Sequence, residues 1–142
     1  MDPLIARLTG LTQAHTEFME VVDQLEPAQR DRPGVCGEWS VQQVVAHLIG
    51  WDELFVEFIV RPETFTPPQD VDQFNQRSVE NRSGDRWDQL MREMTATFDA
   101  LRRVVAGVSE EVKIYDRVIA WLDGRIEDYA LHRTQIAAWL DQ

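Results

Sequence analysis

Apolar residues recur every three or four positions in four long segments of this chain, and this spacing constrains its fold more than any other feature. The spacing places apolar side chains along one face of an α-helix. No segment shows the sustained alternation of apolar and polar residues that marks a half-buried strand. Four helices with one apolar face each can bury those faces against one another. The sequence therefore predicts an all-α four-helix bundle.

The first helix is expected between Leu4 and Leu25, with apolar residues at steps of three and four and His15 in the gap of the stripe. Pro27 is expected to end it, and the residues 33–37 (Pro-Gly-Val-Cys-Gly) predict a turn.

The second helix is expected from Val41 to residue 60. Ser40 followed three residues later by Gln43 matches a capping box, and Trp39 and Val44 occupy the positions of a hydrophobic staple. Pro62 disfavours helix at the residue before it, which sets the end.

A long connection of residues 61–84 follows, in which residues 70–81 can form a short helix. Such a connection is expected to cross an end of the bundle or to cover an opening. The third helix is expected from Trp87 to a C-terminal cap at Gly107, and the fourth from about Val118 to the end of the chain.

Composition narrows the class of protein. A chain of 142 residues, 44% hydrophobic and 27% charged, is typical of a single globular domain, here residues 1–142. Its formal net charge of −11 opposes binding to nucleic acid, which requires clustered Lys and Arg. No apolar stretch is long enough for a membrane span and the N-terminus has no secretory signal, so a cytoplasmic location is expected. Cys36 is the single cysteine, and we interpret it as a small turn residue rather than a nucleophile.

Two histidines and one aspartate form a candidate metal site. His47 lies three residues after Val44 and four before Trp51, which directs it to the interior. Asp128 and His132 are separated by one helical turn, so both can hold one ion from a single helix, and bundle cores often collect ligands from facing helices. His47, Asp128 and His132 are thus predicted as the metal ligands.

Three protein ligands leave coordination positions open, as in catalytic sites, and two imidazoles with one carboxylate suit Zn, Ni, Fe or Mn. The alternative is that the histidines are ordinary core residues, with Asp128 in a buried ion pair that joins two helices.

Further residues near these positions admit two interpretations. His15 is either a pocket or ligand-supporting residue or an ordinary core histidine. The charged run of residues 116–127 is most simply a solvated face, although Arg125 is placed to meet an anionic substrate. The aromatic residues at helical spacing are interpreted as core packing rather than a substrate cage; they are Trp51, Trp121, Tyr129 and Trp139.

Two stretches carry a family resemblance. Residues 39–52, with a Trp-Ser cap, then His47, then Trp51-Asp52, resemble the second helix of DinB-like proteins, and residues 126–136 resemble their last helix. The resemblance extends over most of the chain. It implies a bundle with up-down-down-up connectivity, a divalent metal bound by a histidine triad, and often a homodimer.

By position, His47 and His132 match two ligands of that family, whereas Asp128 stands where the family usually has a histidine. The mycothiol-dependent maleylpyruvate isomerase group, which is similar, uses an acidic residue at this place. The resemblance therefore implies a metal-dependent enzyme that acts on a small molecule, either an S-transferase using a thiol such as mycothiol or bacillithiol, or a hydrolase. The alternatives are a non-catalytic small-molecule-binding or sequestering bundle and a structural homodimer.

Overall fold

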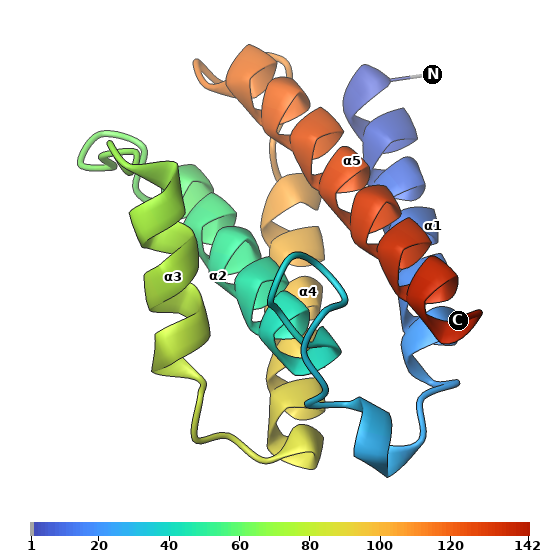
Figure 1. Ribbon diagram of the computed structural model, residues 1–142. Helices are drawn as coiled ribbons and strands as arrows, with labels where there is room; N and C mark the ends of the chain where they lie inside the picture. Colours follow the sequence, from blue (N-terminus) through green and yellow to red (C-terminus); the bar gives the residue numbers. More distant parts are fainter. Residues whose placement is uncertain (1) are drawn as a thin grey trace.

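The computed structural model describes residues 2–142, and over these residues it contains five α-helices, one short 3-10 helix and no strand (Figure 1). The α-helices are α1 (Pro3–Val22), α2 (Val41–Val60), α3 (Val71–Asn81), α4 (Trp87–Ala106) and α5 (Tyr115–Leu140). The 3-10 helix η1 (Pro27–Gln29) follows α1. The all-helical class predicted from the sequence is confirmed, with one α-helix more than the four long ones.

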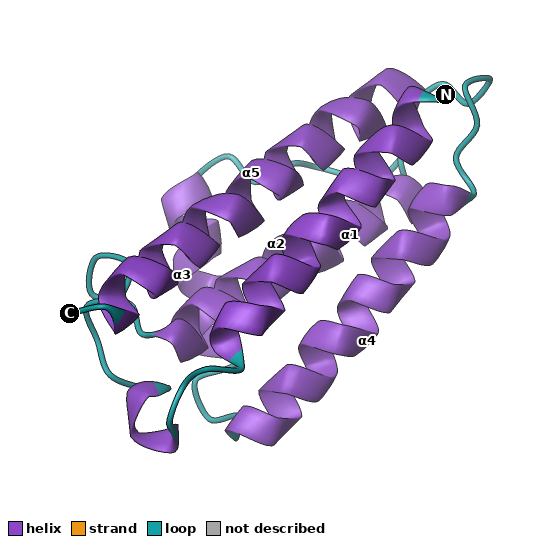
Figure 2. Cartoon of the chain, turned by 90° about the vertical axis from the view of Figure 1, so that its right-hand side faces the viewer, coloured by secondary structure: helices purple, strands orange, loops and turns teal. Residues whose placement is uncertain are grey.

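The four long helices pack as two pairs. α1 lies along α5 and α2 lies along α4, and α2 also contacts α5 (Figures 1 and 2). In Figure 1, α1 and α5 both run downward, while α2 and α4 both run upward. α3 lies against α2 on the outer side of this arrangement.

One hydrophobic core fills the space between the long helices. It is built from the apolar stripes that the spacing predicted, and its largest fully buried side chains come from α1, α2, α4 and α5. They include Leu4, Leu11, Phe18, Leu48, Ile49, Phe55, Phe58, Leu90, Met94, Leu101, Leu122 and Tyr129. Burial of these side chains, at about 1.5–3 kcal/mol each, drives the helices together.

The start of α2 agrees with its predicted cap. The Ser40 hydroxyl accepts a hydrogen bond from the Gln43 amide at 3.2 Å, and the Gln43 side chain accepts one from the Ser40 amide at 2.9 Å. Both donors would otherwise lack a partner at the helix end. At the other end of the bundle, α4 stops before Gly107 as expected.

Two helix boundaries differ from the predicted ones. α1 ends at Val22 rather than at Pro27, because the amides of Gln24 and Leu25 bond to carbonyls three residues back and tighten the last turn. α5 begins at Tyr115, three residues before the expected start.

Part of the long connection between α2 and α4 forms α3, as expected for residues 70–81, and α3 is held close to α2 at Gly50. A β-carbon added to Gly50 would lie 2.7 Å from the β-carbon of Ser78 and would also meet its hydroxyl. Glycine therefore permits an approach that any other residue would obstruct. This contact brings the polar side chains of α3 to the side of α2 that carries His47.

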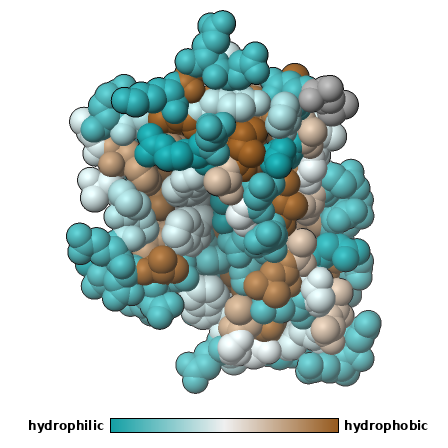
Figure 3. Space-filling view, turned by 90° about the horizontal axis from the view of Figure 1, so that it is seen from above, coloured by the Kyte–Doolittle hydropathy of each residue, from teal (hydrophilic) through white to brown (hydrophobic). Residues whose placement is uncertain are grey.

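The face seen from above is hydrophilic around most of its edge, with hydrophobic atoms in smaller patches (Figure 3). Within residues 2–142, none of the helices combines the length and the hydropathy that a membrane crossing requires.

Candidate metal centre

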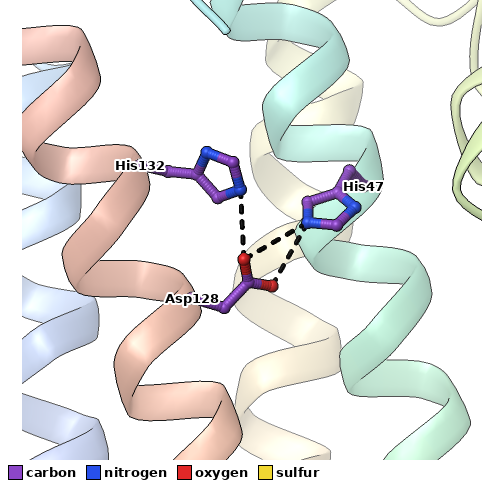
Figure 4. A group of neighbouring side chains, drawn as sticks. All are labelled: His47, Asp128 and His132. Carbon is purple, nitrogen blue, oxygen red and sulfur yellow. Dashed lines mark hydrogen bonds and ion pairs between the residues drawn. The ribbon is translucent and has the colours of Figure 1, made fainter.

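His47 from α2 and Asp128 and His132 from α5 point toward one another between the two helices (Figure 4). One donor atom from each residue lies within 4.8 Å of the other two. The two histidines are buried and Asp128 is half-buried. The predicted triad is therefore brought together, with one residue from α2 and two from successive turns of α5.

The two donor distances to Asp128 Oδ1 are compatible with a small divalent ion. His132 Nε2 lies 3.1 Å from Asp128 Oδ1, and His47 Nε2 lies 3.4 Å from the same oxygen. Two donors bonded to a tetrahedral ion at 2.0–2.1 Å are separated by about 3.3 Å. The donor set, two imidazole nitrogens and one carboxylate oxygen, is also one that such ions prefer.

Asn75 on α3 fixes the orientation of His47. Its Oδ1 accepts a hydrogen bond from Trp51 Nε1 at 2.6 Å, and because indole nitrogen can only donate, this atom is the oxygen of the amide. The same oxygen lies 3.1 Å from His47 Nδ1, which must therefore carry a hydrogen. The ring of Trp39 packs against His47 on another side, with centroids 5.2 Å apart.

The position of this hydrogen determines whether Nε2 of His47 turns a lone pair or a hydrogen toward Asp128. With the hydrogen on Nδ1, a neutral imidazole turns the lone pair of Nε2 toward the carboxylate oxygens, which lie 3.2 and 3.4 Å away. Two lone pairs repel at this distance. The arrangement is favourable when either a second proton on Nε2 or a cation lies between the two groups.

His132 has a comparable support on its outer side. Its Nδ1 lies 2.7 Å from Gln135 Oε1, one turn further along α5. As with Asn75 and His47, a polar side chain that does not belong to the ligand set holds the ring nitrogen that faces away from Asp128. Such supports are typical of histidine metal ligands.

Arg125 holds the other oxygen of Asp128. Its Nη1 donates to Asp128 Oδ2 at 2.6 Å, while Oδ1 faces His132 and His47 lies near both oxygens. Burial by itself would raise the pKa of Asp128, but hydrogen bonds from His132 and His47 and the charge of Arg125 outweigh burial and lower it below its ordinary value. Asp128 is therefore an ionised carboxylate, the form that binds cations.

Arg125 also pairs with a second carboxylate, that of Asp52. Arg125 Nε donates to Asp52 Oδ1 at 2.8 Å, and the Tyr129 hydroxyl donates to Asp52 Oδ2 at 2.6 Å. Burial by itself would lower the pKa of Arg125, but the charges of Asp52 and Asp128 raise it above its ordinary value. Burial and the charge of Asp52 raise the pKa of Tyr129, so Tyr129 remains a neutral donor.

A cavity of about 610 Å³ opens beside the triad. His47, Arg125 and Asp128 form its polar wall, together with Asn75. The remainder is mostly apolar and comes from α3, α2 and α5: Val71, Trp51, Ala120, Trp121, Gly124 and Leu131, with Glu127 at one side. The volume is in the range of small-molecule sites.

Other sequence interpretations require revision. Arg125 is neither exposed to solvent nor free to bind an anionic substrate, because it is 4% exposed and forms ion pairs with two carboxylates. Trp51 and Trp121 line the cavity, whereas Tyr129 is a core residue as expected. Cys36 lies half-buried in the turn before α2.

His15 lies outside the ligand set. Its ring stacks on Phe98 with centroids 3.8 Å apart and meets the edge of Tyr129 at 5.5 Å. His15 Nε2 is buried without a hydrogen-bond partner. Of the two interpretations of His15, the packing agrees with a core histidine.

The sequence interpretation assigned no role to Asn75, Asp52 or Gln135. The spacing of Asp52 indicated that it is buried, since it lies four residues after Leu48 and three before Phe55 and therefore on the buried stripe of α2. Asn75 lies in a segment that the family resemblance covers, but helical periodicity gave it no role, because α3 is largely polar and the contact with His47 spans 28 residues of sequence.

A comparison with known protein families gives a match over most of the chain. The family model described as the mycothiol maleylpyruvate isomerase N-terminal domain matches residues 11–137, a range that includes all three residues of the triad. No curated protein and no solved structure matches the chain.

Proposed function

The chain belongs to the mycothiol maleylpyruvate isomerase N-terminal domain family, a DinB-like family, and from this premise we propose that it is a divalent-metal-dependent enzyme using a low-molecular-weight thiol. The observation that carries the proposal is the convergence of three donor atoms within 4.8 Å beside an apolar cavity. Mycothiol, named in the family description, and bacillithiol are the proposed thiols. The reaction class is S-transfer to a small electrophile.

His47, Asp128 and His132 would hold the ion, which is Zn, Ni, Fe or Mn by the chemistry of the donor set. Three protein ligands leave at least one coordination position for a thiol or water. A divalent cation at this place supplies positive charge that favours the deprotonated form of a thiol near neutral pH.

The side chains divide the remaining tasks. Asn75 and Gln135 keep the two imidazoles turned toward Asp128, and Arg125 holds the carboxylate of Asp128 through its Oδ2. The apolar cavity walls would contact the electrophile. In the transfer, the thiolate sulfur bonds to the electrophilic carbon, the leaving group departs with its bonding electrons, and the thiol proton passes to solvent.

The finer features of the family are part of the same proposal. We propose the up-down-down-up connectivity of DinB-like bundles for the four long helices, which the parallel courses of α1 with α5 and of α2 with α4 in Figure 1 support. The homodimer and the cytoplasmic location remain predictions.

Metal analysis of protein purified without added ions or chelator tests the ligand set. We expect close to one equivalent of a divalent metal in the wild type and loss of that metal in His47→Ala. His15→Ala is the matched control, because this histidine lies outside the triad. If the wild type carries no metal and a chelator leaves its melting temperature unchanged, the proposal fails.

Asp128 requires its own test, since DinB-like proteins usually have a histidine there. Asp128→His is expected to retain the metal, while Asp128→Ala is expected to lose it. Unchanged metal content in Asp128→Ala would remove this residue from the site. Thiol consumption with electrophilic substrates then separates S-transfer from hydrolysis, in which water takes the place of the thiol.

A second candidate has its own support. The hydrogen bonds among Asn75, His47, Asp128 and Arg125 form a continuous network when a proton occupies the position of the ion. A non-catalytic binding or sequestering protein would use the same cavity without a metal. Chelator-insensitive ligand binding with no thiol consumption would favour this candidate.

A further inference from the structure

The cavity beside the triad continues along α5, away from the candidate ligands, to two tryptophans. Its lining residues on this helix, from Ala120 to Leu131, recur at steps of three and four and so share one face. Trp121 precedes Asp128 by seven residues, which is about 10 Å along the helix axis. The cavity therefore has a polar end at the triad and an aromatic end at Trp121 and Trp51.

Gly124 lies on α5 between these two ends. It follows Trp121 by three residues and precedes Asp128 by four, so it occupies the same face of the helix, and it lines the cavity. A glycine inside a helix lowers the stability of that helix relative to alanine. This cost is justified where packing or function requires the absence of a side chain.

Packing does not explain Gly124. Three glycines of the described chain lie inside α-helices: Gly10, Gly50 and Gly124. A β-carbon added to Gly50 would obstruct Ser78, and one added to Gly10 would lie 3.4 Å from a side-chain atom of Ile126. A β-carbon added to Gly124 would have no neighbour within 4 Å among the residues that the structure describes. A side chain at this position would instead extend into the open space of the cavity.

The aromatic end is held in place by contacts outside the cavity. The ring of Trp121 lies nearly parallel to those of Phe55 and Phe58 on α2, with centroids 5.0 and 5.7 Å apart. The ring of Trp51 meets that of Phe74 on α3 at 4.8 Å. Both tryptophans are half-buried and line the cavity. An aromatic ligand can meet such rings edge-to-face or offset-stacked, and both arrangements are more favourable than apolar burial alone.

We infer that the open space over Gly124 accommodates a ligand that extends from the triad to Trp51 and Trp121, and that the part of this ligand remote from the triad is an aromatic ring. Gly124 is then a specificity-determining residue. The inference rests on the proposed function in one respect, since this ligand would be the electrophile, with its reacting end at the triad. That end can be a carbonyl or a carboxylate, because an ion held by the triad would accept either. Binding of the aromatic end does not depend on the ion.

Titration with 2-naphthylmethanol, in the full chain with a chelator present, tests the aromatic end. The indole N–H signals in a proton–nitrogen correlation spectrum report each tryptophan separately, and Trp→Phe variants assign them. We expect the signals of Trp51 and Trp121 to shift at about millimolar probe concentration, the range for a ligand of this size. The signal of Trp87 on α4 should stay unchanged, because this residue does not line the cavity.

The saturated counterpart, decahydro-2-naphthylmethanol, tests the preference for an aromatic ring. It should bind at least about threefold more weakly, because it forms no ring–ring contact with the tryptophans. If neither tryptophan signal responds to the naphthyl probe, or if the saturated probe binds equally well, the inference is wrong.

Gly124→Leu tests the space between the two ends. Its side chain would fill part of that space, so we expect at least fivefold weaker binding of the naphthyl probe. Ala130→Leu is the matched control, because it introduces the same side chain on α5 at an exposed residue that does not line the cavity. The control should bind the probe as the wild type does. Unchanged probe binding in Gly124→Leu would contradict the inference.

Gly124→Ala separates this role from a structural one. If the fold required glycine here, alanine would lower the midpoint of urea denaturation, whereas we expect an equal or higher midpoint because alanine favours helix. A lower midpoint would overturn the inference. Normal probe binding with a changed oligomeric state in Gly124→Leu would also overturn it and would assign Gly124 to an interface between copies. These measurements use neither metal nor thiol, so their outcome is separate from that of the metal and thiol assays.

Discussion

A single oxygen atom on α3 joins that helix to the candidate ligands. Asn75 Oδ1 accepts from both His47 Nδ1 and Trp51 Nε1, so one amide orients an imidazole and one of the two tryptophans of the cavity wall. Neither contact involves the donor atoms that face Asp128. Asn75 is therefore a positioning residue, and its loss should act on the affinity for metal more than on folding.

We expect Asn75→Ala to weaken metal binding by 10- to 100-fold, the usual effect of removing a hydrogen-bond partner of a metal-binding histidine. Competition with a chromophoric chelator measures this. Asn75→Asp keeps an acceptor oxygen and should retain most of the affinity. Asn81→Ala, at the exposed end of the same helix, is the control. Wild-type affinity in Asn75→Ala would show that His47 needs no such support.

At the scale of elements, the position of α3 depends on the absence of a side chain at Gly50. Its neighbour Ser78 is buried, and the β-carbon of Ser78 is attached to the backbone, so it cannot rotate away. An added methyl group must push the two helices apart. Asn75 lies one turn before Ser78 and would move with α3.

Gly50→Ala is therefore expected to cost about 1–3 kcal/mol of unfolding free energy and to weaken metal binding. Urea denaturation and chelator competition measure the two effects. Adding Ser78→Gly to this variant removes the obstructing atoms, and the metal affinity should recover. A Gly50→Ala protein with unchanged affinity would mean that Asn75 does not depend on this contact.

The buried group of Asp52, Arg125 and Tyr129 joins α2 to α5. Asp52 is 1% exposed, and its two oxygens accept from Arg125 and Tyr129. Removing one partner of a buried ion pair leaves the other charge poorly compensated. The surface pair of Arg7 and Asp123 offers a contrast, because both side chains are well exposed.

We predict that Asp52→Ala lowers the free energy of unfolding by about 3–5 kcal/mol, measured by urea denaturation. Asp123→Ala, which breaks the surface pair, should cost no more than about 1 kcal/mol. Similar costs for the two variants would contradict the assignment of Asp52 as the main polar link between these helices.

At the scale of the whole molecule, the four long helices were predictable because each one carries its own periodic signal. The cap at Ser40 and the burial of His47 and His132 follow from spacing along single helices, and the structure confirms them. The role of Asn75, the pairing of Arg125 with Asp52, and the cavity could not be predicted. Each arises where separate helices meet, and local periodicity contains no information about which residues come together there.

His15 makes the stability of the whole molecule sensitive to acid. Burial lowers the pKa of His15 below its ordinary value of 6.5; the carboxylates of Asp52 and Asp99 act in the opposite direction, and Arg102 adds to the lowering. The unfolded chain therefore binds a proton more readily than the folded one. Stability from this residue is present above pH 6.5 and is lost as the pH falls toward the lower folded-state pKa.

Replacing His15 with Phe removes this titration. We expect the unfolding free energy of the variant to fall less steeply below pH 6.5, by at most about 1.4 kcal/mol per pH unit. Urea denaturation at several pH values gives the slope. An identical slope in both proteins would show that His15 protonates equally well in the folded state.

The turn before α2 packs against the candidate metal site through the ring of Trp39. Trp39 precedes the cap of α2, its backbone bonds back to Val35 and Cys36, and its ring packs against His47. Fraying of the first turn of α2 would thus withdraw the ring from the imidazole. Hydrogen exchange at the amides of residues 41–44 and solvent access to His47 are expected to rise together, so that local unfolding of one helix end acts as the entrance to the triad.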